Sequence, residues 1–131
     1  MYKKAFIVDD DEISIFLAEA TLEVESLATD IQGFPDAKQA LDTLITLLQN
    51  QPDNVPELIL LDLNMPLLSG WDFLNALAPY EEQLANRCRI YILTSSVDKQ
   101  EIQKAQDYNL VTGFLQKPLE DEALEKLKKG M

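Results

Sequence analysis

Five short apolar runs, separated by longer segments of helical periodicity, constrain the fold of this chain most strongly. Four of these runs are apolar at consecutive positions, which is typical of strands that are buried on both faces in a parallel sheet covered by helices, whereas residues 27–31 form a weaker pattern that Thr29 and Asp30 interrupt. Right-handed crossovers between such strands predict an α/β fold with a doubly wound, five-stranded parallel sheet and helices on both faces. The runs are residues 5–8, 27–31, 58–61, 90–93 and 113–115.

Apolar residues at helical spacing predict one helix after each strand. Asp36 followed by Gln39 has the spacing of a capping box at the start of the second helix. Asp98 and Glu101 have the same spacing at the start of the fourth helix, which we expect to extend through Tyr108. The pattern consists of Ile13, Phe16, Leu17, Ala20 and Val24 in the first helix, Ala40, Leu41, Leu44, Leu47 and Leu48 in the second, and Trp71, Leu74, Leu77 and Ala78 in the third, and a last short helix follows Pro118.

Length and composition narrow the class of protein. The 131 residues suit one domain, and we expect residues 1–131 to form it. The net charge of −12 opposes direct binding to nucleic acid or to an anionic membrane surface. No apolar run has the length of a signal peptide core or of a membrane span. A single cysteine, Cys88, fits a reducing compartment, and we expect a cytoplasmic protein. The absence of histidine excludes histidine-based catalysis.

Polar residues that follow the strands carry the candidate chemistry. Because the carboxyl ends of parallel strands meet at one edge of a sheet, side chains at these positions are expected to lie together. If the first and third strands are neighbours, Asp9, Asp10 and Asp62 converge. The full set is Asp9, Asp10 and Asp11 after the first strand, Asp62 after the third, Thr94, Ser95 and Ser96 after the fourth, and Lys117, followed by Pro118, after the fifth.

This set of residues meets the main requirements of phosphoryl transfer onto an aspartate. Clustered carboxylates repel one another, and a hard divalent cation such as Mg²⁺ offsets that repulsion. A carboxylate is itself a nucleophile that forms an aspartyl-phosphate without a base. Lys117 would pair with the phosphoryl oxygens, and the Thr94 hydroxyl would donate a hydrogen bond to them. A cis peptide bond before Pro118 would aim Lys117 inward.

Four sequence elements, each at a strand end, then make the chain recognisable. They are Ile7-Val8-Asp9-Asp10, Asp62-Leu63-Asn64-Met65-Pro66 with Gly70 four residues later, Thr94-Ser95, and Lys117-Pro118. In this order the chain resembles the receiver domain of bacterial two-component response regulators over essentially its whole length. The resemblance implies a flavodoxin-like fold with strand order 2-1-3-4-5. One departure is the stretch of residues 49–56, a predicted loop that looks longer than is usual in the family.

The resemblance also implies a role for each matching residue. Asp62 corresponds to the phosphoacceptor, Asp10 to the direct Mg²⁺ ligand and Asp9 to its partner, which often acts through water. Asn64 corresponds to the position whose backbone carbonyl coordinates the metal. The remaining matches are Thr94, the switch hydroxyl, Phe114, the switch aromatic residue, and Lys117, the lysine of the site. Asn64 and Ser96, which flank the site, would tune the lifetime of the phosphorylated state.

The resemblance further implies partners and an output. The phosphoryl donor would be a sensor histidine kinase or a histidine phosphotransfer protein. A downstream protein target would bind the face made by the fourth helix, the fifth strand and the last helix, and the same face would permit a homodimer. We expect no output domain, and no enzymatic activity beyond phosphotransfer to the chain itself and autodephosphorylation.

Alternative readings of these residues stay open at the level of sequence. Asp9–Asp11 fit an N-cap run, Asp62 a turn, Lys117 a solvated lysine, Thr94 a strand residue and Phe114 a core residue. A phosphatase of the haloacid dehalogenase type would need a second acid where Asn64 stands. A flavodoxin would offer hydroxyls and amides to its flavin phosphate where this chain has acids. A receiver-fold scaffold that is not phosphorylated is the main alternative function.

Overall fold

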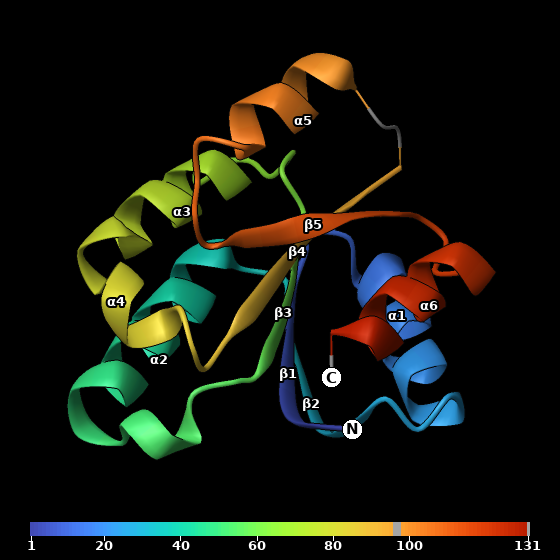
Figure 1. The fold of residues 1–131 in the computed structure, drawn as a ribbon, viewed down its shortest axis with the longest axis horizontal. Helices are drawn as coiled ribbons and strands as arrows, with labels where there is room; N and C mark the ends of the chain where they lie inside the picture. The colour runs from blue at the N-terminus through green and yellow to red at the C-terminus, as the bar shows by residue number, and fades with distance from the viewer. Residues whose placement is uncertain (96–97, 131) are drawn as a thin grey trace.

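The five predicted strands form one parallel sheet in the order β2-β1-β3-β4-β5. The computed structural model describes residues 1–95 and 98–130, which are shown in Figure 1. The predicted α/β class and the predicted strand order are therefore confirmed. The strands are β1 Tyr2–Val8, β2 Ala28–Phe34, β3 Leu58–Leu61, β4 Arg89–Thr94 and β5 Val111–Gln116.

Helices cover both faces of the sheet. In Figure 1, α1 and α6 lie on one side, and α2, α3 and α4 lie on the other. The bounds of the helices are α1 Glu12–Val24, α2 Ala37–Asn50, α3 Gly70–Leu77, α4 Glu81–Leu84, α5 Lys99–Ala105 and α6 Asp121–Lys129, with 3₁₀ turns at Pro52–Asn54 and Ala78–Tyr80. Among the residues that the structure describes, none of these helices has both the length and the apolar character needed to cross a bilayer.

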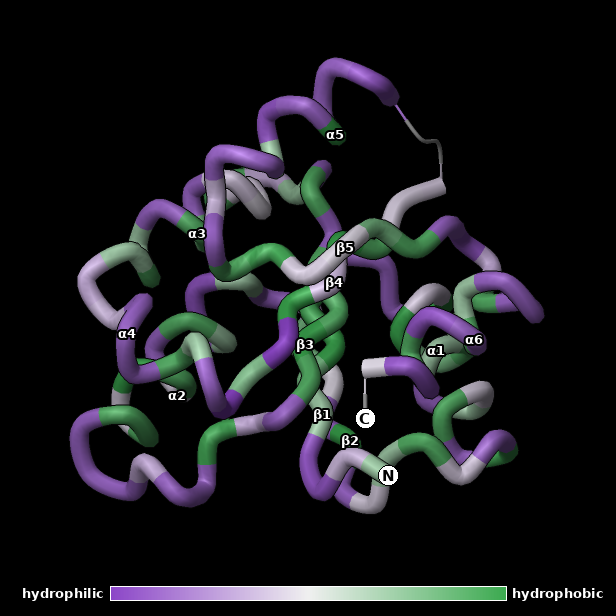
Figure 2. Tube along the Cα trace, viewed as in Figure 1, coloured by the Kyte–Doolittle hydropathy of each residue, from purple (hydrophilic) through white to green (hydrophobic). Residues whose placement is uncertain are grey.

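Alternate residues of the central strands pack into two separate hydrophobic cores, one on each face of the sheet. In β1, Phe6 and Val8 pack with α2 and α3, whereas Ala5 and Ile7 pack with α1 and α6. The same alternation in β3 and β4 explains why their sequences are apolar throughout, since a strand buried on both faces has no solvent-facing side. Figure 2 shows this as a hydrophobic centre surrounded by more hydrophilic outer turns.

Side-chain caps set the starts of several helices. Asp36 accepts hydrogen bonds from the backbone of Lys38 and Gln39 at the start of α2, and Asp98 accepts one from Gln100 at the start of α5. Both predicted N-termini are confirmed. Two helix ends differ from the prediction. Helix α5 ends at Ala105 rather than at Tyr108, and the first two residues of the predicted loop 49–56 belong to the end of α2, ahead of the 3₁₀ turn.

Helix α1 is present as predicted, but the apolar stripe that predicted it points outward. Ile13, Phe16, Leu17 and Val24 are exposed, and Phe16 retains 69 % of its accessible surface. The helix instead buries Ile15, Ala18 and Leu22 against the sheet. An exposed apolar stripe of this size on one helix is a common property of protein-binding surfaces.

The strand register brings the candidate residues to one edge of the sheet. Val8 pairs with Leu61, so the chain leaves β1 and β3 side by side at Asp9 and Asp62. The backbone amide of Asp62 donates to the Val8 carbonyl at 2.9 Å. At the other end of this edge, the amide of Lys117 donates to the Thr94 carbonyl at 2.7 Å. The long connection of residues 49–56 precedes β3 and therefore lies at the end of the sheet opposite to Asp9 and Asp62.

Candidate functional site

Three carboxylates converge at the carboxyl ends of β1 and β3. Asp9, Asp10 and Asp62 each offer an oxygen within 4.8 Å of the others. Asp9 retains 1 % of its accessible surface and Asp62 retains 8 %, whereas Asp10 is exposed. Buried charges need a compensating partner. The predicted convergence of these residues is present, and the cluster combines two shielded acids with one that faces solvent.

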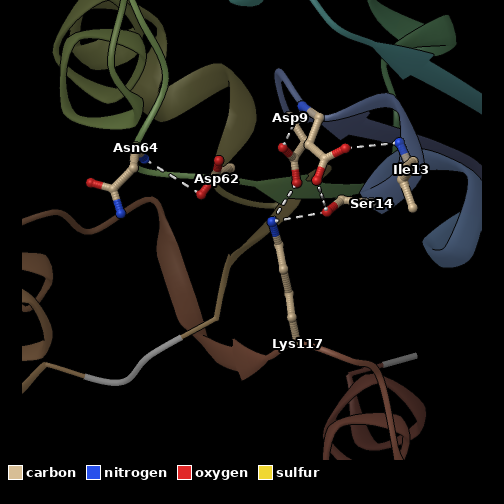
Figure 3. Close-up of polar contacts among 7 residues, drawn as sticks. Asp9, Ile13, Ser14, Asp62, Asn64 and Lys117 are labelled. Atoms are coloured by element: carbon tan, nitrogen blue, oxygen red, sulfur yellow. Dashed lines mark hydrogen bonds and ion pairs between the residues drawn. The ribbon is translucent and has the colours of Figure 1, made fainter.

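Lys117 supplies the positive charge at this cluster. Its Nζ donates to Asp9 Oδ2 at 2.5 Å and lies 3.5 Å from Ser14 Oγ. The peptide bond between Lys117 and Pro118 is cis, as hypothesised from the sequence. Figure 3 shows the Lys117 side chain extending to Asp9 and Ser14, with Asp62 and Asn64 to the left of Asp9 in this view.

Asp11 caps helix α1 next to the site. Its Oδ1 accepts a hydrogen bond from the Ile13 amide at 2.9 Å, and its own amide donates to Asp9 Oδ1 at 3.0 Å. The hydrogen bond from Ile13 is the main reason why the pKa of Asp11 is lowered. Asp11 therefore serves as the N-cap, while its amide helps to fix the orientation of the Asp9 carboxylate.

Asp62 is the acid whose pKa is displaced most clearly upward. Burial, together with the negative charge of Asp9, raises its pKa from 3.8 to about 6, although Lys117 opposes this shift. Its Oδ1 accepts a hydrogen bond from the Asn64 amide at 3.4 Å. Because the ionised form of Asp62 is destabilised in this way, a nearby cation would stabilise it. The oxygen-only donor set of three carboxylates fits a hard divalent cation such as Mg²⁺.

The loop after Asp62 depends on the absence of a side chain at Gly70. A Cβ there would lie 2.6 Å from the Asp62 carbonyl oxygen and 2.8 Å from Leu63 Cα. The Gly70 amide also donates to the Leu63 carbonyl at 3.1 Å. The first turn of α3 therefore packs directly on the backbone of the candidate phosphoacceptor.

Thr94 and Phe114 lie on β4 and β5, the two strands that follow β3 in the sheet. Thr94 ends β4 and is buried, with 3 % of its surface accessible. Phe114 in β5 is half-buried and packs against the cluster of Leu63, Ile92 and Ala105. Ser96, which was expected to flank the site, lies outside the described residues.

Ser14 was not identified from the sequence. It lies in the first turn of α1, where its Oγ donates to Asp11 Oδ2 at 3.2 Å and faces Lys117. A serine in the first turn of a helix that follows an acidic run is a weak signal. Ser14 and Lys117 lie far apart in the sequence, and their contact is apparent only in the structure.

Comparison with known proteins identifies the family. The family model described as the response regulator receiver domain matches residues 5–129. The chain is a member of the response regulator receiver family. Among curated proteins, no sequence matches the chain significantly.

Solved structures agree with this receiver assignment. A two-component response regulator from Cytophaga hutchinsonii superposes with a TM-score of 0.88 at 26 % identity, covering 98 % of this chain and 95 % of that one. A response regulator receiver protein from Dyadobacter fermentans is 32 % identical, with a TM-score of 0.82 and coverage of 98 % and 97 %. The Vibrio cholerae chemotaxis protein CheY4, at 23 % identity, a TM-score of 0.76 and full coverage of both chains, shows the flavodoxin-like fold alone.

Membership in the receiver family defines the function at a coarse level. The chain is a phosphoacceptor signalling module of a two-component system, and the alternative of an unphosphorylated scaffold is not favoured. Receiver domains bind Mg²⁺ at an acidic pocket and interact with histidine kinases and phosphotransfer proteins. The acidic cluster of this receiver is the counterpart of that pocket.

Proposed function

We propose that Asp62 is the phosphoacceptor of this receiver. The observation that carries the proposal is the convergence of Asp9, Asp10 and Asp62 within 4.8 Å, with Lys117 bound to Asp9. In the transfer, a carboxylate oxygen of Asp62 forms a bond to phosphorus while the bond from phosphorus to the donor histidine nitrogen breaks. The histidine nitrogen retains the electron pair, so no base is required in this chain.

We propose that Asp9, Asp10, Asp62 and the backbone carbonyl of Asn64 hold Mg²⁺. The metal, when bound, would neutralise the negative charge on the incoming phosphoryl group. Lys117 then pairs with a phosphoryl oxygen, for which its long flexible side chain is suited. Burial and the raised pKa of Asp62 support this assignment, because they make the unliganded carboxylate unfavourable.

The proposed chemistry is limited to the chain's own aspartate. A phosphatase of the haloacid dehalogenase type would need a second acid at residue 64, where this chain has Asn64. We therefore propose no enzymatic activity other than self-directed phosphotransfer and autodephosphorylation. The cytoplasm is the proposed location, which the single cysteine supports.

We propose that phosphorylation changes the surface of a single receiver domain spanning residues 1–131. Thr94 would move to donate a hydrogen bond to the phosphoryl group, and Phe114 would turn into the space it leaves. The result is a shift between two packings of the same fold. The surface formed by α5, β5 and α6 would then bind a downstream protein or a second copy of the chain. The half-buried position of Phe114 in this surface supports its role.

The exposed stripe on α1 supports a docking surface for the phosphoryl donor. Leu17 and Thr21 line a groove of ≈ 340 Å³ that Leu119 and Lys117 close from the other side, so it is continuous with the site. Residues 12–24 contain glutamates and neither lysine nor arginine. We propose that the donor presents an apolar ridge with basic residues at its edges, because those charges complement the acidic edges of the stripe.

The proposal is tested by intact mass after incubation with Mg²⁺ and a small phosphoryl donor. We expect the wild type to gain one phosphate, and we expect EDTA or Asp62→Asn to abolish the gain. A matched control is Asp53→Asn, which removes an exposed acid at the opposite end of the sheet and should leave the gain unchanged. Retention of the phosphate in Asp62→Asn would refute the assignment of the phosphoacceptor.

A further inference from the structure

Helix α5 has little buried surface of its own. Of the residues in α5, all of which are described, Ala105 alone is buried. Most of the helix is hydrophilic in Figure 2, and in Figure 1 it lies at the periphery near α3 and β5. A helix held by so few apolar contacts belongs to the part of a fold that shifts at low energetic cost. The position of α5 therefore depends largely on its polar and aromatic contacts.

Those contacts centre on Trp71 in the first turn of α3. The ammonium of Lys104, in the last turn of α5, lies 4.5 Å from the centre of the Trp71 ring. The Tyr108 ring lies 5.6 Å from the same ring at a tilt of 32°, and its hydroxyl donates to Asn75 Oδ1 of α3 at 2.8 Å. We call the group of Trp71, Lys104 and Tyr108 the α3–α5 contact.

The α3–α5 contact is joined to the phosphoacceptor by two short routes. Gly70, the residue before Trp71, packs on the backbone of Asp62 and Leu63 with no space for a side chain. Trp71 also packs on the cluster of Leu63, Ile92 and Ala105, against which Phe114 packs as well. A displacement at Asp62 or a rotation of Phe114 therefore acts on a group that the Trp71 ring already touches.

We propose that the α3–α5 contact is a second switch element, which holds α5 in its unphosphorylated position and yields when Asp62 is modified. This inference rests on the proposed function. A contact made in only one of two states shifts the equilibrium toward that state, and its removal favours the other. Trp71 and Lys104 therefore act as positioning residues for α5, and weakening their contact makes the phosphorylated packing easier to reach.

Trp71 provides its own readout, because it is the only tryptophan in the chain. The probe is beryllofluoride with Mg²⁺, a stable mimic of a bound phosphoryl group, and calorimetry reports its binding independently of fluorescence. We expect the Trp71 emission to change when beryllofluoride is added, beyond any change caused by Mg²⁺ alone. In Lys104→Gln, we expect the probe to bind about two- to fivefold more tightly, the range that corresponds to an exposed cation–π contact.

Two further variants separate the effect of losing the contact between Lys104 and Trp71 from the effect of losing one positive charge. Lys99→Gln removes the same charge from an exposed position at the start of α5 and should bind the probe like the wild type. Lys104→Arg keeps a cation over the ring and should also restore wild-type affinity. Probe binding without a change in Trp71 emission, or equal affinities in Lys104→Gln and the wild type, would overturn this inference alone. A lack of probe binding to the wild type would overturn the proposed function and this inference with it.

Discussion

The ammonium of Lys117 lies 2.5 Å from Asp9 Oδ2 and thereby joins the ends of β5 and β1, two strands that β3 and β4 separate in the sheet. Asp9 is almost completely buried, so this ion pair compensates a charge that is otherwise costly. Lys117 therefore serves as an internal counter-ion for the same carboxylate that we propose as a metal partner. Lys117 and Mg²⁺ are expected to compete for Asp9.

The first prediction concerns Lys117→Gln. We expect this variant to bind Mg²⁺ about three- to tenfold more tightly, because a positive charge beside the acids is removed. We also expect phosphate uptake from a small donor to slow by about tenfold or more, because the phosphoryl oxygens lose a partner. Calorimetry measures the first effect and intact mass the second. Lys38→Gln, an exposed variant of equal charge in α2, should change neither quantity. Weaker Mg²⁺ binding in Lys117→Gln would contradict competition.

The second prediction follows from the raised pKa of Asp62. The folded protein binds the Asp62 proton more tightly than the unfolded chain, since the pKa rises from 3.8 to about 6. This group therefore destabilises the fold above pH 6, and the destabilisation is relieved as the pH falls from about 6 to 3.8. Without Mg²⁺ at pH 7, we expect Asp62→Asn to be more stable than the wild type by about 1–2 kcal/mol, after discounting for solvent at the open side.

Urea denaturation at several pH values checks this second prediction. The stability advantage of Asp62→Asn should shrink between pH 6 and pH 4. Saturating Mg²⁺ should stabilise the wild type more than the variant, because ligand binding to the folded state adds to its stability. An advantage that stays constant from pH 7 to pH 4 would show that the pKa of Asp62 is not raised.

The fold and the acidic cluster were predictable because both depend on local pattern and topology. An apolar run such as residues 58–61 identifies a buried strand, and a parallel sheet then brings Asp9 and Asp62 to one edge regardless of side-chain detail. The positions of Asp10 and Lys117 followed from the same argument. These features need no knowledge of packing beyond the order of the strands.

The rest depends on packing that a single sequence does not encode locally. The stripe containing Phe16 has the same period whether it is buried or exposed, and only the neighbouring Ile15 and Leu22 reveal which side faces the sheet. Ser14 meets Lys117, and Trp71 meets Lys104, across long separations in sequence. Such pairs depend on how the helices pack on the sheet, and the hydrophobic periodicity of the sequence does not predict them.

The third prediction concerns Gly70→Ala. The added Cβ would meet backbone atoms of Asp62 and Leu63, which cannot rotate away. We expect a loss of about 1–3 kcal/mol in the free energy of unfolding, together with slower phosphate uptake, because the Asp62 backbone must shift. Gly113→Ala is the matched control, since its Cβ would lie 3.5 Å from the Tyr91 ring, an ordinary contact. Equal stability of the two variants in urea would contradict the close packing of α3 on Asp62.

The fourth prediction concerns Phe16→Ser on the exposed face of α1. Phe16 lies on the stripe that we propose as the docking surface of the donor, and its ring contributes little to the core. We expect phosphate uptake from a small donor to remain unchanged, because the acidic cluster is intact. With a phosphorylated histidine protein that modifies the wild type, we expect transfer to slow by about tenfold or more, since loss of a buried aromatic residue at an interface costs about 2 kcal/mol.

Val24→Ser is the control for this fourth prediction. Val24 is equally exposed but lies at the end of α1 farthest from Asp9 and Asp10, so its replacement should slow transfer much less. The two rates, measured with the small donor and with the protein donor, separate docking from chemistry. If Phe16→Ser slowed both to the same extent, the α1 face would act on the site itself and not on donor binding. If it slowed neither, the donor would dock elsewhere on the receiver.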